Sequence, residues 1–172
     1  MRALSRNNGT EKWLNKAESL SKGGNHDEAL NICQRVIDEE PDSYLAYEVR
    51  SSIHRRNGNV ERALEDVGQV IRLVPNEAAP LFRRGRYQML SKAYEAAAED
   101  FSKALELDDG YFGDTLLFYR AEALLRCNDY EGALKDCKAM KANHVEHFFL
   151  GYQKRDRNDI ANDASAGLSR AR

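Results

Sequence analysis

Histidine is the residue of this chain best suited to metal binding or proton transfer near neutral pH. His26 and His54 are isolated, whereas His144 and His147 are three positions apart and enclose Glu146. The helical zinc motif His-Glu-x-x-His needs its two histidines four positions apart, so this pair lacks the required spacing. We therefore expect no metal ion and no cofactor.

Adjacent carboxylates and cysteines are the other residues with chemical potential. Glu39-Glu40 and Asp108-Asp109 each follow an apolar stretch, where polar residues are expected to end a helix. Cysteines occur at Cys33, Cys127 and Cys137, and two of these stand among apolar residues, as small buried thiols do. We predict that the chain is not an enzyme and that it resides in the reducing cytoplasm.

The elements that must position these residues are helices, because apolar side chains recur at helical spacing in four segments. The leading alanines of the first three segments are 34 residues apart, and the fourth follows after 36. Pro41 and Pro75 keep the 34-residue period, each just past a segment where a helix must stop. The segments are Ala29-Leu30-Cys33-Val36-Ile37, Ala63-Leu64-Val67-Val70-Ile71, Ala97-Ala98-Phe101-Ala104-Leu105 and Ala133-Leu134-Cys137-Met140.

A small residue precedes each segment by twelve positions, namely Ala17, Ser51, Gly85 and Ala121. Glycine in mid-helix costs about 1 kcal/mol relative to alanine, so Gly85 needs a packing reason. We expect the small residues of a first helix to face small residues of a second helix, which lets two antiparallel helices approach closely.

Polar turns divide the chain into helix pairs. In the first pair we expect Thr10 to cap the first helix and Trp13 to pack inward. The first helices of the pairs are expected at about 11–22, 43–56 and 114–126, and the second helices follow the turns and end near Asp38, Leu73 and Lys141; the third pair lies within 78–109. The expected turns are Gly23-Gly24-Asn25, Asn57-Gly58-Asn59 and Asn128-Asp129. In the tail, EHFFLGYQKR is apolar enough to dock on the fourth pair, and Ile160, Ala164 and Leu168 form a thin stripe.

The repeat resembles the tetratricopeptide repeat (TPR), whose 34-residue signature reads W-x2-L-G-x2-Y, then A-x3-F, then P. Lys16, Arg50 and Arg84 replace its first leucine, and Asp109 replaces a third proline. The residues that match in place are Trp13, Gly85, Phe101, Pro41, Pro75 and the four leading alanines, and the match covers roughly residues 10–143. The resemblance implies an all-α fold, a right-handed solenoid of antiparallel helix pairs.

The expected organisation has three parts. Residues 1–9 form a disordered lead-in, four TPR units occupy 10–43, 44–77, 78–113 and 114–143, and 144–172 form a capping helix or a degenerate fifth repeat. A cap is expected because the last repeat of a solenoid otherwise exposes a core surface.

Charge and hydropathy exclude several classes of partner. The net charge is −2; residues 1–86 hold 14 basic and 13 acidic side chains, and residues 87–172 hold 12 and 15. This even distribution disfavours nucleic acid and anionic membranes. No apolar run approaches the ~20 residues that span a bilayer, and MRALSRNNGT lacks the apolar region of a secretory signal.

In the TPR family the first helix of each pair lines a concave face, so the resemblance implies a groove that binds a polypeptide. Five residues on this face are apolar at positions that we do not expect to belong to the core, and exposed apolar residues in a concavity are typical of an interaction site. They are Leu14, Phe82, Met89, Phe118 and Leu125. We predict Phe82, Phe118 and Arg86 as anchors, because aromatic residues and arginine dominate interface energetics. The predicted partner-binding positions are Leu14, Glu18 and Ser21; Leu45, Glu48, Ser52 and Arg55; Phe82, Arg83, Arg86 and Met89; and Phe118, Tyr119, Glu122 and Leu125.

Some TPR domains hold the acidic tails of heat-shock chaperones in a clamp of lysine, asparagine and arginine. At the clamp positions this chain carries Leu14, Glu18, Val49, Ala79 and Arg83, of which only Arg83 fits. Glu18 would repel the carboxylate that the clamp has to hold. We therefore do not expect a chaperone tail as the ligand.

The prediction is a non-catalytic protein-interaction module that binds a peptide or helix with apolar anchors and an acidic group. An adaptor and an inhibitor or immunity-type protein are its specific forms. The alternative is a regulatory or oligomerisation segment of a larger enzyme or assembly, with self-association through the tail. Nucleic-acid binding through Arg83-Arg84-Arg86 ranks third, because the neighbouring repeats have no matching basic stripe.

Overall fold

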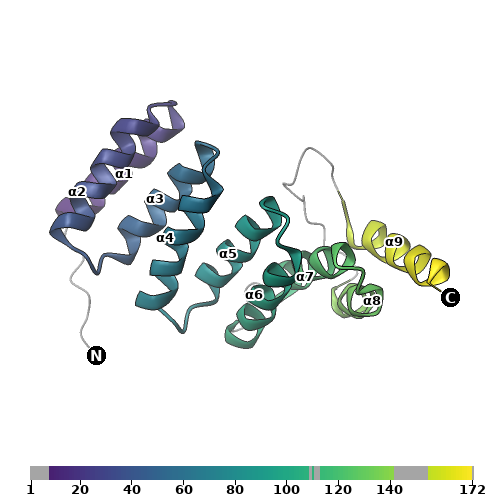
Figure 1. Cartoon of the computed structure of the whole chain (residues 1–172). Helices are drawn as coiled ribbons and strands as arrows, with labels where there is room; N and C mark the ends of the chain where they lie inside the picture. The colour runs from purple at the N-terminus through teal and green to yellow at the C-terminus, as the bar shows by residue number, and fades with distance from the viewer. Residues whose placement is uncertain (1–7, 109, 111–112, 142–154, 172) are drawn as a thin grey trace. The chain divides into compact units, whose positions relative to one another are not determined.

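The computed structural model describes residues 8–108, 110, 113–141 and 155–171. These residues form nine α-helices and no β-strand. The chain divides into two compact units, residues 1–75 and 76–172 (Figure 1).

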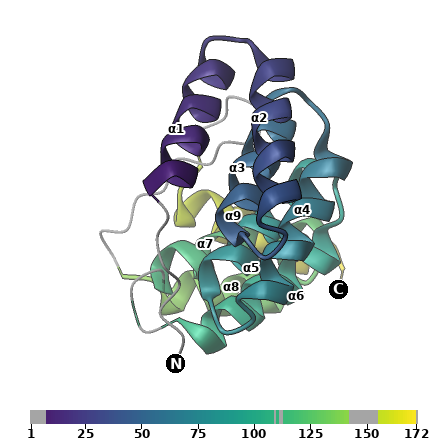
Figure 2. The same cartoon turned by 90° about the vertical axis from the view of Figure 1, so that its left-hand side faces the viewer.

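The first unit contains two helix pairs. Helix α1 (Asn8–Lys22) packs on α2 (His26–Glu39), and α3 (Tyr44–Arg56) packs on α4 (Val60–Leu73). Figure 2 shows α1 and α2 side by side, joined by a short turn. Helix α3 also contacts both helices of the first pair. The buried core of this region comprises Leu14, Ala17, Ala29, Ile32, Cys33, Val36, Ile37, Ala46 and Ile53.

The second unit continues the pattern with five helices. They are α5 (Ala78–Leu90), α6 (Tyr94–Leu107), α7 (Gly113–Arg126), α8 (Tyr130–Ala139) and α9 (Arg157–Arg170). Each helix packs on the next, and α7 additionally contacts α5 and α9. The helices therefore surround α7 on several sides and bury most of its surface.

The three predicted turns within the helix pairs are confirmed, and a fourth turn lies between α5 and α6; each of the four contains one residue in the left-handed region. These residues are Gly24 (φ 88°), Gly58 (φ 78°), Lys92 (φ 62°) and Asn128 (φ 63°), at corresponding positions of the four repeats. After three of these turns, the side chains of Asn25, Asn59 and Asp129 accept a hydrogen bond from the backbone N–H of the third helical residue. Such caps satisfy N–H groups that have no partner within the helix, and so fix where the second helix of a pair begins.

Gly85 has a packing partner that was not predicted. A Cβ atom at this position would lie 2.5–2.9 Å from three ring atoms of Phe101. The glycine therefore makes room for a large, fully buried ring on α6. That Gly85 also faces a small residue of α6 stays a prediction.

Two predictions for α1 are wrong. Thr10 is not the cap, because the helix begins at Asn8; its hydroxyl instead donates a 2.7 Å hydrogen bond to Glu40. Trp13 does not pack inward, since its side chain is 44 % exposed. The adjacent Leu14 and, one turn on, Ala17 take the buried face, and the indole lies between the side chains of Lys16 and Arg35.

The predicted apolar stripe of the tail lies on α9, but one of its three residues differs. Ile160 and Ala164 on α9 are buried, but the third buried position is Gly167, while Leu168 is half-buried. Tyr130 on α8 lies where a side chain of Gly167 would be. Of the segment EHFFLGYQKR, only Arg155 is among the described residues. The role of α9 as a cap and the boundaries of the four units stay predictions.

Candidate functional site

The candidate site begins with an aromatic cluster in the second unit. Phe82 on α5 lies edge-on to Tyr119 on α7, with 5.2 Å between ring centroids. Phe101 on α6 lies 6.0 Å from Phe82 and 5.8 Å from Tyr119. Phe118 adds a fourth ring 5.8 Å from Tyr119. The cluster connects three successive helices and fixes the position of the half-buried Phe82.

Arg86 lies directly on this cluster. Its guanidinium carbon is 5.6 Å from the centroid of Phe82 and 5.5 Å from that of Tyr119, within the range of cation–π attraction. The residue is exposed, and it makes no ion pair with a carboxylate in the described part of the chain. Because ring contacts leave the N–H groups at the edge of a guanidinium available, Arg86 can present them to a carboxylate.

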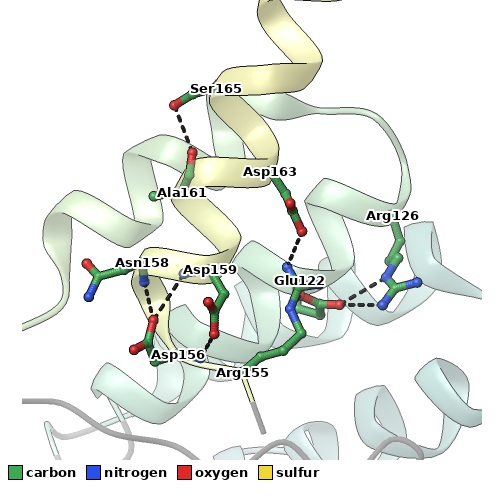
Figure 3. A network of polar contacts seen from close by, with 9 residues as sticks. All are labelled: Glu122, Arg126, Arg155, Asp156, Asn158, Asp159, Ala161, Asp163 and Ser165. Carbon is green, nitrogen blue, oxygen red and sulfur yellow. Dashed lines mark hydrogen bonds and ion pairs between the residues drawn. The ribbon is translucent and has the colours of Figure 1, made fainter. Parts of the chain in front are cut away.

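Glu122, one turn after Tyr119, is the buried member of an ion network that reaches the surface (Figure 3). Its carboxylate accepts a 2.9 Å hydrogen bond from Nε of Arg126 and lies 3.3 Å from Nε of Arg155. Arg155 also donates a 2.7 Å hydrogen bond to Asp163 on α9. The network connects α7 to the start and the middle of α9, which explains a fully buried carboxylate on α7.

The burial of Glu122 contradicts its predicted place on the groove surface, and the same holds for several other positions. Leu14, Met89 and Phe118 are 4 %, 2 % and 1 % exposed, so the prediction that they lie outside the core is wrong. Ser21 and Tyr119 are buried as well. These residues stand on helix faces that pack against neighbouring helices, and they support the surface instead of forming it.

The remaining predicted positions keep some exposure. Arg55 and Arg86 are exposed, and the half-buried positions are Glu18, Leu45, Glu48, Ser52, Phe82, Arg83 and Leu125. Of the exposed and half-buried residues, the structure brings Phe82 and Arg86 into contact. A single groove along all four first helices stays a prediction.

A recurring ion pair was not predicted from the sequence. Arginine on the first helix of a pair binds a buried aspartate 16 residues later on the second helix, in three successive repeats. The pairs are Arg50–Asp66 at 2.6 Å, Arg84–Asp100 at 2.6 Å and Arg120–Asp136 at 2.7 Å. The signal was available, because the three aspartates recur with the period of the repeat. Arg84 is therefore engaged inside its own helix pair, and the hydrogen bonds to Asp100 raise its pKa.

The groups suited to chemistry are dispersed. Burial lowers the pKa of His54, and it raises the pKa of the Cys33 thiol to about 12 and that of Cys137 to about 11. Among the described residues, no three His, Cys, Asp or Glu side chains are grouped so as to hold a metal ion. His144, Glu146 and His147 lie outside those residues. No helix in the described ranges is long and apolar enough to cross a membrane.

A family model described as tetratricopeptide repeat matches residues 14–78 and 52–112, which together cover more than half of the chain. The chain belongs to the TPR family. The predicted fold class, an all-α repeat solenoid, is thereby confirmed.

The relatives of the chain are longer proteins, and each matches it over only a small part of its own length. Human DnaJ homolog subfamily C member 3 is 30 % identical over 96 residues, which cover 56 % of this chain and 19 % of that protein. Human tetratricopeptide repeat protein 13 is 38 % identical over 81 residues, covering 46 % and 9 %. RNA polymerase II-associated protein 3 of Xenopus tropicalis is 33 % identical over 106 residues, covering 60 % and 16 %. The chain thus spans less than a fifth of each of these relatives.

Solved structures with the same fold are TPR proteins of low sequence identity. One of them is YrrB, which is described as a TPR protein with an unusual peptide-binding site. Its structure has a TM-score of 0.70 at 14 % sequence identity, and the match covers 92 % of this chain and 76 % of the YrrB chain. MamA from Desulfovibrio magneticus RS-1 has a TM-score of 0.66 at 17 % identity, covering 76 % and 72 %. These likenesses show the fold. TPR repeats generally form protein-interaction modules, which is the coarse function of this chain.

Proposed function

We propose that this chain is a non-catalytic module that binds a peptide or helix of a partner protein, with an acidic group of the partner at Arg86. The observation that supports this is the exposed guanidinium over the rings of Phe82 and Tyr119. An arginine held in this way loses little conformational freedom on binding a carboxylate. Arginine and aromatic residues also supply much of the binding energy at protein interfaces.

Two further observations support the proposal. Phe82 is half-buried and lies beside the charge of Arg86, so the site combines an aromatic ring with a cation. A solved neighbour, YrrB, is described as having a peptide-binding site. An adaptor and an inhibitor of a partner enzyme are the two narrower forms of this function, and the unpaired, buried thiols of Cys33 and Cys137 suit a reducing, cytoplasmic setting.

A peptide-display selection on the purified protein tests the proposal. We expect enrichment of sequences that place Asp or Glu next to an aromatic or aliphatic residue. A selected peptide should bind the Arg86→Ala variant at least about tenfold more weakly. The control is Arg72→Ala on α4, which removes an equally exposed arginine from the other unit. Equal affinity of the wild type and Arg86→Ala, or no enriched sequence, would contradict the proposal.

A second candidate function follows from the coverage of the relatives, in which the region that matches this chain is a small part of a longer protein. In that case the repeats serve as a regulatory or oligomerisation segment of a larger assembly. Light scattering distinguishes the two functions: a dimer that becomes monomeric when residues 144–172 are removed favours the second candidate.

A further inference from the structure

A second surface feature of the second unit is an open groove of about 550 Å³ along α6. Figure 1 shows α6 next to α7, and the groove runs beside the end of α7 and the turn into α8. Its lining contains no residue of the Arg86 site. The lining residues are Glu95, Ala98, Glu99, Ser102, Lys103, Glu106, Leu124, Cys127 and Asp129.

A small side chain, Ala98, is among the residues that line this open groove. Ala98 occupies the position at which the other three repeats carry Leu30, Leu64 and Leu134. In the first unit, Leu30 packs against the core. At the next turn of the helix the repeats vary, with Gln34, Gly68, Ser102 and Lys138 at the equivalent positions, so only Ala98 distinguishes the third repeat. The third repeat therefore lacks about the volume of one aliphatic side chain at a position that its neighbours fill.

The rim of the groove is acidic. Glu95, Glu99 and Glu106 are exposed along one face of α6, and Asp129 is exposed at the end of the groove. Lys103 is the one basic residue of the lining. Burial, together with the charges of Glu95 and Asp129, raises the pKa of the Cys127 thiol to about 11. Carboxylates beside an apolar floor attract a cationic group that carries an apolar chain.

We propose that this groove docks a segment of a partner protein that inserts an aliphatic side chain over Ala98 and places lysine or arginine against Glu95, Glu99 and Glu106. The aliphatic group matches the missing leucine, and the cations match the rim. This segment has the opposite charge to the ligand of Arg86. The chain consequently has two binding surfaces that select different sequences.

Fluorescence anisotropy with a labelled amphipathic peptide of lysine and leucine tests the inference. We expect saturable, micromolar binding at low salt, and no binding of the peptide in which glutamate replaces every lysine. Ala98→Leu should weaken binding at least about tenfold because the new side chain fills the floor. Since leucine is the residue of the other three repeats, this variant should retain the helical circular dichroism of the wild type.

A matched pair of charge variants separates the groove from net charge. Glu99→Lys with Glu106→Lys should weaken binding at least about tenfold, whereas Glu61→Lys with Glu65→Lys, the same change of charge on exposed positions of α4, should change it less than about twofold. Arg86→Ala should leave binding of the lysine peptide unchanged. Equal effects of the two charge pairs, wild-type affinity of Ala98→Leu, or a loss of affinity in Arg86→Ala would each overturn the inference.

Discussion

Gly85 and Phe101 together set the distance between α5 and α6. The ring of Phe101 is fully buried and lies over the glycine, and it also contacts Phe82 and Tyr119. A change at Gly85 therefore acts on the cluster that supports Arg86. The ring has little freedom to move aside, because close-packed neighbours hold it.

The Gly85→Ala variant should lower the free energy of unfolding by about 1–3 kcal/mol, because its methyl group overlaps the Phe101 ring. The control is Gly68→Ala on α4, where nothing lies within 4 Å of the added atom. There the better helix propensity of alanine should raise the free energy by up to about 1 kcal/mol. Urea denaturation measures both, and stabilisation by Gly85→Ala would contradict the packing described.

His54 should make the free energy of unfolding depend on pH. Burial lowers its pKa below the ordinary value of 6.5, with Arg50 and Arg62 acting in the same direction and Asp66 and Glu65 opposing them. The unfolded chain therefore binds a proton more readily than the folded chain. The contribution of His54 to stability is complete above about pH 6.5 and is lost as the pH falls towards its folded pKa.

We expect His54→Gln to lose less stability than the wild type between pH 7.5 and 5.5. Urea midpoints at the two pH values measure this loss. The same fall in midpoint for both proteins would show that His54 does not titrate in this range.

At the scale of the helix pair, the arginines of the three ion pairs, Arg50, Arg84 and Arg120, stand at the position of the first leucine in the TPR signature. The aspartates of these pairs are 2–3 % exposed, so each is a nearly buried charge. Removing one partner of such a pair leaves the other charge buried without compensation, whereas apolar replacement of both is often neutral. We therefore expect each intact pair to add little net stability.

For α5 and α6, we expect Asp100→Ala to lower the free energy of unfolding by about 2–3 kcal/mol. Replacing both residues, Arg84→Leu with Asp100→Leu, should remain within about 1 kcal/mol of the wild type. A double-mutant cycle by urea denaturation compares these variants. A double variant as unstable as Asp100→Ala would contradict this view of the pair.

The sequence predicted the helices and turns of the pairs well because turn residues and apolar spacing are local signals. It did not predict which face of α1 is buried: Trp13 and Leu14 are adjacent and both apolar, and only the packing of α2 and α3 decides between them. Phe118 and Met89 were misplaced for the same reason. Arg86 is exposed, as expected for a position that lines a groove, although its guanidinium contacts Tyr119 on α7; its role in binding stays a prediction.

At the scale of the molecule, the second unit carries both proposed surfaces. At the first surface, the guanidinium of Arg86 lies over aromatic rings. At the second, carboxylates surround Ala98 in the groove along α6. A TPR module with two such surfaces can hold two partner segments of opposite charge. The proposed function depends on a polypeptide that binds at the Arg86 surface, on α5 and α7.

The most direct measurement is an NMR titration of the labelled protein with a peptide selected by display. We expect the amide signals that shift to belong to α5 and α7 around Arg86 and Tyr119, and we expect Arg86→Ala to abolish these shifts. Shifts confined to α6 and the turn into α8, or shifts that persist in Arg86→Ala, would contradict the proposed function.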